Sequence, residues 1–238
     1  MHQTLIDELR LTLKTQADEA TRQSASRFFK EDQQVLIYGL KSPDASKLAS
    51  GFCKQVKSFS KQEVFAICEE LWKSHYLEEA IIACKCTEAL SKQTEPGDFT
   101  VFEQWVTTYV TNWATCDTLC NHTVGDFIMK YPDYIQQLKK WATSSNRWTK
   151  RAAAVTLIIP ARKGLFLKDV FEIADILLLD SDDMVQKGYG WMLKAASESH
   201  QTEVFNYVLS KKAVMPRTAL RYAIEKMPKE LKVEAMKK

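Results

Sequence analysis

Trp113 and Asp117 combine residue types and a spacing that could do chemistry. They lie four residues apart, and on a helix this spacing places both side chains on one face. An indole ring beside a carboxylate favours a nearby positive charge, the ring through its quadrupole and the carboxylate through its own charge. A structural interpretation stays open, in which Trp113 belongs to the core and Asp117 caps a helix.

Basic residues gather after this segment. Residues 1–140 contain 16 basic and 19 acidic residues, whereas residues 141–238 contain 17 and 11, so the two halves carry net charges of −3 and +6. The positive half indicates an anionic partner, and nucleic acid is favoured over a membrane because Trp and Tyr residues lie near the basic positions. The alternative is the solvated face of a helical protein.

Six cysteines are present, and their spacing does not indicate a metal site. The pairs Cys84-x-Cys86 and Cys116-x3-Cys120 do not match a CxxC pattern, and the four histidines do not fall at matching intervals. The first residues, 1–14, carry charges among their apolar positions and do not resemble an export signal. We therefore expect reduced, buried thiols and a soluble, cytoplasmic protein, nucleoid-associated if bacterial.

Helices must position these residues. Apolar residues recur at helical spacing along nearly the whole chain, and 7 Gly with 6 Pro are too few for a turn-rich all-β fold. No window reaches the ~18 uninterrupted apolar residues of a membrane helix. Short breaks, such as 42–44, 58–61, 95–98 and 180–183, predict about a dozen helices joined in hairpins. Trp72, Trp105 and Trp141 lie in apolar stripes and are predicted to be core.

Two segments resemble each other. Residues 148–155 and 184–191 align at an offset of 36 residues, each with a basic residue followed by small ones, and 77–84 is a weaker third copy. Such similarity is typical of stacked helix pairs. We predict an all-α fold, a curved α-solenoid of HEAT-like repeats forming one domain over residues 1–238, with a concave surface that suits a long ligand.

Three segments carry a resemblance to a known family. Residues 112–117 (NWATCD), 146–153 (NRWTKRAA) and 185–191 (VQKGYGW) resemble the HEAT-repeat DNA alkylation repair family, the AlkD-type alkylpurine DNA glycosylases. Residues 38–43 (YGLKSP) resemble its N-terminal Gly-to-Pro turn. The chain departs from the pattern at residues 27–30 (RFFK), which lack a tyrosine hydroxyl, and at 44–46 (DAS), where relatives carry basic residues.

The resemblance implies an enzyme of base excision repair. It would hydrolyse the N-glycosidic bond of N3- or N7-alkylated purines in duplex DNA, with no metal or nucleotide cofactor. Asp117 would be the catalytic carboxylate, Trp113 and Trp191 the aromatic plates against the deoxyribose, and Arg151 a residue that holds the backbone. The other predicted DNA contacts, for which ordinary solvated cations are the alternative, are Arg147, Lys150, Arg162, Lys163, Lys187, Lys194, Arg217 and Arg221.

These residue types agree with that chemistry. Alkylation at N3 or N7 makes the base cationic and a good leaving group, so the deoxyribose, which gains oxocarbenium character, is what needs stabilisation. Family members of this type are thought to leave the base out of any deep pocket. Bulky lesions should then be tolerated, provided that they are cationic.

Two other classes stay open. One is a catalytically silent HEAT-repeat protein that binds damaged or branched DNA, and the other is a HEAT-type scaffold for protein interactions. For the enzyme we expect a monomer on duplex DNA, with no membrane and no obligate protein partner.

Overall fold

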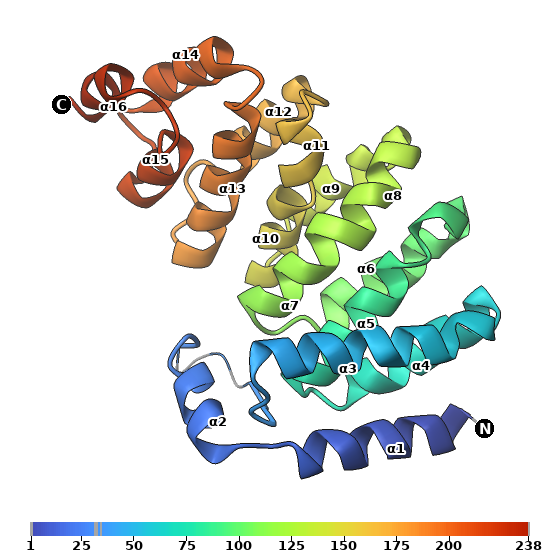
Figure 1. Ribbon diagram of the computed structural model, residues 1–238. Coiled ribbons are helices and arrows are strands. Elements are labelled where there is room, and N and C mark those ends of the chain that lie inside the picture. The colour runs from blue at the N-terminus through green and yellow to red at the C-terminus, as the bar shows by residue number, and fades with distance from the viewer. Residues whose placement is uncertain (1, 31–32, 34, 238) are drawn as a thin grey trace. The chain divides into compact units, whose positions relative to one another are not determined.

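The computed structural model describes residues 2–30, 33 and 35–237, and every regular element among them is a helix (Figure 1). The described backbone outside the helices contains one isolated bridge, between Leu36 and Tyr76. The predicted all-α fold is confirmed. The described residues form two compact units, 1–119 and 120–238. One continuous repeat domain over the whole chain stays a prediction.

Helices of the first unit begin at breaks that the sequence predicts. At the start of one helix, the Ser60 hydroxyl accepts from the Glu63 backbone N–H and the Glu63 carboxylate accepts from Ser60, which forms a capping box. The helices of this unit are α1 (His2–Thr15), α2 (Glu19–Ser26), α3 (Ser42–Gln55), α4 (Lys61–Lys73), α5 (Leu77–Glu88), α6 (Phe99–Thr108) and α7 (Trp113–Thr118).

Helix α5 lies at the centre of the first unit. It packs against α3, α4 and α7, and its residues Ala80, Ile82 and Ala83 are buried. Trp72 of α4 and Trp105 of α6 are 1% and 0% exposed, with ring centroids 6.2 Å apart, as predicted for core residues. Through α5, this core supports the short helix that carries Trp113 and Asp117.

The expectation of six reduced cysteines is wrong for one pair. Cys53 of α3 and Cys86 of α5 form a disulfide, with their Cα atoms 5.0 Å apart. The sequence does not show this pairing, because the two residues are separated by 33 positions and become neighbours only when α3 packs on α5. The other four cysteines, Cys68, Cys84, Cys116 and Cys120, are buried and lie outside this disulfide, as predicted for reduced thiols.

The second unit consists of shorter helices packed in series. Several have five to eight residues, and the predicted number of about a dozen helices is therefore too low. They are α8 (Gly125–Lys130), α9 (Ile135–Ala142), α10 (Arg147–Val155), α11 (Ile158–Arg162), α12 (Leu167–Leu177), α13 (Asp183–Ala196), α14 (Gln201–Lys211), α15 (Arg217–Ala223) and α16 (Lys229–Met236).

The repeat seen in the sequence corresponds to two helices that pack on each other. Asn146 caps α10 and Asp182 caps α13, each by accepting backbone N–H groups in the first turn, and these caps lie 36 residues apart in the sequence. Gly190 of α13 allows α15 to approach closely, because a Cβ there would lie 2.8 Å from the Ala219 carbonyl oxygen. The small residue Gly190 therefore permits close helix packing, and α10 also packs on α13.

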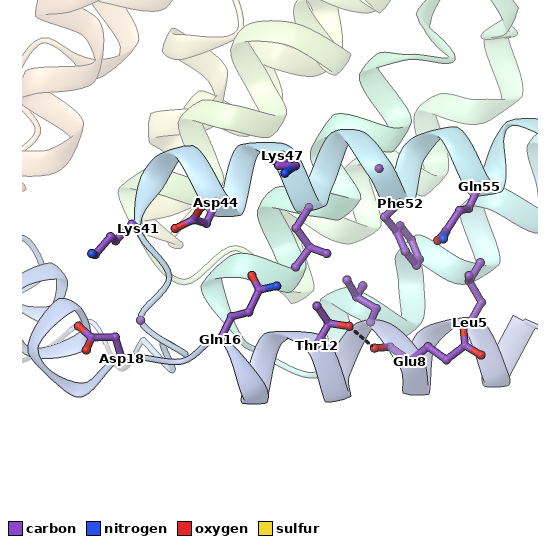
Figure 2. Close-up of a pocket in the computed structure, with 14 residues that line it drawn as sticks. Leu5, Glu8, Thr12, Gln16, Asp18, Lys41, Asp44, Lys47, Phe52 and Gln55 are labelled. Atoms are coloured by element: carbon purple, nitrogen blue, oxygen red, sulfur yellow. Dashed lines mark hydrogen bonds between the residues drawn. The ribbon is translucent and has the colours of Figure 1, made fainter.

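A cavity of about 710 Å³ lies between α1 and α3 in the first unit (Figure 2). Apolar residues such as Leu9 and Phe52 line it together with charged ones such as Glu8 and Lys47. Trp113 and Asp117 are not among its lining residues. No helix in the described part of the chain is long and apolar enough to cross a membrane.

Candidate active site

The short helix α7 places Trp113 and Asp117 on one face. Asn112 is its N-cap, with its side-chain oxygen accepting from the Thr115 backbone N–H at 3.0 Å. Thr115 and Cys116 are buried on the opposite side, whereas Trp113 and Asp117 are half-buried. The prediction that the pair shares a helix face is confirmed, and the capping role considered for Asp117 belongs instead to Asn112.

The indole of Trp113 is held by the segment that follows α2. Its ring stacks on Phe29, with centroids 5.7 Å apart and planes inclined by 24°. Its Nε1–H donates to the Phe28 backbone carbonyl at 3.2 Å. These contacts fix the ring plane and cover one of its faces. The segment that differs from the family pattern by lacking a tyrosine hydroxyl therefore positions Trp113.

A buried glutamate anchors this N-terminal segment to α5. The Glu78 carboxylate accepts backbone N–H groups from Tyr38 at 3.0 Å and Gly39 at 2.9 Å. Gly39 has a φ of +96°, and its carbonyl accepts the Asp18 N–H at the start of α2. A Cβ on Gly39 would lie 2.4 Å from the Asp18 carbonyl oxygen, so only glycine fits this contact.

Glu79, the next residue, connects α1 to the segment that contains Tyr38. Its carboxylate, 0% exposed, accepts from the guanidinium of Arg10 at 3.0 Å and from the hydroxyl of Tyr38 at 2.8 Å. Burial and the bond to Glu79 raise the pKa of Tyr38 well above its ordinary value. Sequence reasoning found no role for these two glutamates. The sequence feature that could have indicated their role is an adjacent pair of acidic residues inside an apolar helical stripe. Carboxylates buried in this way require hydrogen-bond or ionic partners.

A π-helical turn, Leu119–Val124, begins two residues after Asp117. Such turns insert an extra residue into a helix and are frequent at functional sites. The turn contains His122, which is exposed, and Asp126 of the following helix is half-buried.

In the second unit, Arg151 of α10 is 5% exposed and is fixed against α13. Its Nη1 donates to the Met184 backbone carbonyl at 2.6 Å. Gly188 gives it room, because a Cβ at that position would lie 3.2 Å from Arg151 Cγ. The guanidinium is thus held beside the first turn of α13.

Trp191 lies about two turns after Met184 on α13. It is half-buried and shares a partly exposed face with Lys187 and Lys194, which are spaced four and three residues from it. Tyr189 and Met192 are buried on the other side of the helix. Trp191 therefore presents part of its ring to solvent between two lysines.

Most of the predicted phosphate contacts are engaged in ion pairs within the protein. The pairs are Arg147–Asp182 at 2.9 Å, Lys150–Asp180, Lys187–Asp183 at 2.8 Å, Arg162–Glu198 at 3.2 Å and Lys194–Glu225 at 2.9 Å. Lys163 contacts Met129 Sδ at 3.6 Å. Arg217 and Arg221 are exposed and form no ion pair with another described residue.

Most of these ion pairs join segments that are distant in the sequence. Burial alone would raise the pKa of Glu198, but Lys226 and Arg162 together lower it. Four of the five pairs join residues 30 to 36 positions apart, which is about one repeat. Cations of this stretch therefore have a structural role that their spacing in the sequence does not reveal.

No group of three or more His, Cys, Asp or Glu side chains in the described ranges is arranged to hold a metal ion. The family model described as DNA alkylation repair enzyme matches residues 9–227, so the chain belongs to the DNA alkylation repair enzyme family.

A solved structure shares this fold. It is that of a predicted DNA alkylation repair enzyme from Enterococcus faecalis, 16% identical, with a TM-score of 0.79 over 90% of this chain and 98% of that chain. At this identity the likeness is one of fold. No curated protein matches the chain.

Proposed function

We propose that this protein is a DNA glycosylase that releases cationic N3- or N7-alkylated purines from duplex DNA. Membership of the DNA alkylation repair enzyme family supports damaged DNA as the substrate. The observation that carries the glycosylase proposal is the shared face of Trp113 and Asp117 on α7, where Phe29 fixes the indole. An aromatic ring beside a carboxylate suits a sugar that becomes cationic.

The bond to be broken joins C1′ of the deoxyribose to a ring nitrogen of the purine. Alkylation has already given the base a positive charge, so the bonding electrons neutralise it as it leaves. The deoxyribose then carries the positive charge as an oxocarbenium ion. Water attacks C1′ and loses a proton, so that the products are the free neutral base, an abasic site and a proton.

Asp117 is the residue to which we assign the main catalytic role. Its carboxylate stabilises the oxocarbenium ion electrostatically and orients the attacking water or accepts its proton. Trp113 and Trp191 would lie against the deoxyribose of the lesion. Arg151, held by the Met184 carbonyl, would hold the adjacent backbone. The reaction in this form uses no metal and no nucleotide cofactor.

The ion pairs divide the proposed DNA contacts into two groups. Arg217, Arg221 and Lys163 can meet a phosphate without breaking an ion pair within the described chain. The paired cations, such as Arg162 and Lys194, would have to exchange a carboxylate for a phosphate, which lowers their net contribution.

The test is base release from duplexes that differ only in the lesion. We expect free base from duplexes with N7-methylguanine and with a bulkier N7-alkylguanine, and none from one with uracil, whose base is neutral. Binding of all three without release would indicate the silent DNA-binding protein. If the protein shows no binding and no release, the scaffold for protein interactions is the remaining class.

A further inference from the structure

The positive charge of the C-terminal half lies almost entirely at its end. Residues 141–210 contain eight basic and eight acidic residues, whereas residues 211–238 contain nine and three. The basic stretch around residue 150 is therefore balanced by carboxylates. The net excess belongs to the end of α14, to α15 and to the residues after α16, whereas α16 itself has two basic and two acidic residues. We call residues 211–237 the C-terminal basic segment.

Cations of this segment are mostly without acidic partners. Lys211 pairs with Asp175 and Lys226 with Glu198. Glu225, one of its carboxylates, is engaged by Lys194 from α13. The cations that form no ion pair with any described residue are Lys212, Arg217, Arg221, Lys229, Lys232 and Lys237.

The helices that carry these cations are anchored in the core of the second unit. Ala219, Leu220 and Ala223 of α15 are buried, and α15 packs extensively against α13. On the outer side of α15, Arg217 and Arg221 are one turn apart and both exposed. Their side chains therefore project from a supported helix.

Helix α16 carries two more of these cations beside two glutamates, Glu230 and Glu234. Lys229 and Lys232 lie three residues apart on this helix, which packs against α14. The Lys212 ammonium donates to the Lys237 backbone carbonyl at 3.4 Å and connects the ends of α14 and α16. The family match ends at residue 227, so α16 lies beyond the part of the chain that the family model covers.

We propose that the C-terminal basic segment is a second DNA-binding surface, which holds backbone phosphates of undamaged duplex and takes no part in base release. Unpaired cations on a supported scaffold bind a polyanion by releasing its counterions, and arginine forks match phosphate oxygens. The inference rests on the proposed function only in taking DNA as the ligand. It holds whether or not the protein cleaves the glycosidic bond.

The experiment measures binding of an undamaged, labelled duplex by fluorescence anisotropy over a range of salt concentrations. The test variant combines four substitutions, and circular dichroism checks that it folds. They are Lys212→Gln, Lys229→Gln, Lys232→Gln and Lys237→Gln, which leave the proposed glycosylase contacts Arg217 and Arg221 in place.

A control variant removes the same number of charges from exposed lysines elsewhere. Its substitutions are Lys14→Gln, Lys54→Gln, Lys57→Gln and Lys140→Gln.

We expect the slope of log K against log salt to decrease by about 0.9 for each phosphate contact that the test variant loses. Its affinity near 0.1 M salt should fall at least tenfold, while the control changes much less. Equal effects of both variants, or an unchanged slope in the test variant, would overturn the proposal. So would binding of the wild type to anionic phospholipid vesicles with no binding to duplex.

Base release at saturating enzyme separates the two proposals. Loss of binding in the test variant with an unchanged single-turnover rate supports the second surface. If the wild type binds undamaged duplex through this segment but releases no base, the glycosylase fails and the DNA-binding surface stands. If the wild type releases base but the test variant has the same salt slope as the wild type, the glycosylase stands and the second DNA-binding surface fails.

Discussion

The ring of Trp113 stacks on the ring of Phe29, which lies 84 positions earlier in the chain, and the indole N–H donates to the carbonyl of Phe28. An aromatic side chain that packs against a substrate needs a fixed ring plane. For Trp113 this plane is fixed by Phe28 and Phe29, which follow α2. The segment that follows α2 thus positions a residue of the candidate site through ring stacking and a backbone carbonyl.

Replacing Phe29 should therefore impair catalysis through Trp113. In Phe29→Ala the indole loses its stacking partner, and the single-turnover rate of base release should fall about tenfold or more. Stability should drop by about 1 kcal/mol. The matched control is Phe28→Ala, whose side chain is 72% exposed and whose carbonyl remains; equal rate losses in both variants would contradict a positioning role specific to Phe29.

Replacing two glycines of the first unit by alanine should change the free energy of unfolding in opposite directions. Gly39→Ala places a Cβ 2.4 Å from the Asp18 carbonyl oxygen at a φ of +96°, so it should destabilise the protein by about 1–3 kcal/mol. Gly51→Ala meets no atom within 4 Å inside α3 and should stabilise it by about 0.5–1 kcal/mol. Urea denaturation measures both, and a neutral Gly39→Ala would rule out the tight turn.

Alanine substitutions at two glycines of α13 should affect different properties, one base release and the other the free energy of unfolding. Gly188→Ala crowds the stem of Arg151, so base release should fall while the free energy of unfolding changes by less than about 1 kcal/mol, because alanine also favours the helix. Gly190→Ala meets Tyr222 and Ala219 at 2.7 Å and 2.8 Å and should destabilise by about 1–3 kcal/mol. Thermal unfolding and single-turnover rates are the measurements, and the reverse order of stabilities would refute this packing.

Stability should decrease in acid partly because of Glu198. Its pKa is lower in the folded protein than in the unfolded chain, so its contribution is complete above the ordinary value of 4.5 and is lost as the pH falls through the folded value. Glu198→Gln should show a shallower loss of stability below about pH 4.5 than the wild type. Asp133→Asn, at an exposed position, serves as the control, and identical profiles for Glu198→Gln and the wild type would contradict the prediction.

Local features of the fold could be predicted from the sequence. Helical periodicity located the elements, the 36-residue offset matched the caps Asn146 and Asp182, and the i, i+4 spacing placed Trp113 and Asp117 on one face. Each of these depends on residues close together in the chain. For the same reason the buried tryptophans, such as Trp72, were assigned to the core.

Contacts between distant residues could not be predicted in this way. The bond from Tyr38 to Glu79, the stacking of Phe29 on Trp113 and the Cys53–Cys86 disulfide join residues 33 to 84 positions apart. The ion pair between Arg162 and Glu198 likewise appears only when one repeat packs on the next. Composition showed an excess of positive charge, but not which cations were already neutralised.

The most direct test of the account is the single-turnover release of N7-methylguanine from duplex DNA by the wild type and by Asp117→Asn. We predict release by the wild type and a rate about 10²–10³-fold lower in the variant, with unchanged affinity for undamaged duplex. Asp126→Asn, which changes a half-buried carboxylate nine positions later in the chain, should keep the wild-type rate. Release by Asp117→Asn at the wild-type rate would contradict the central claim.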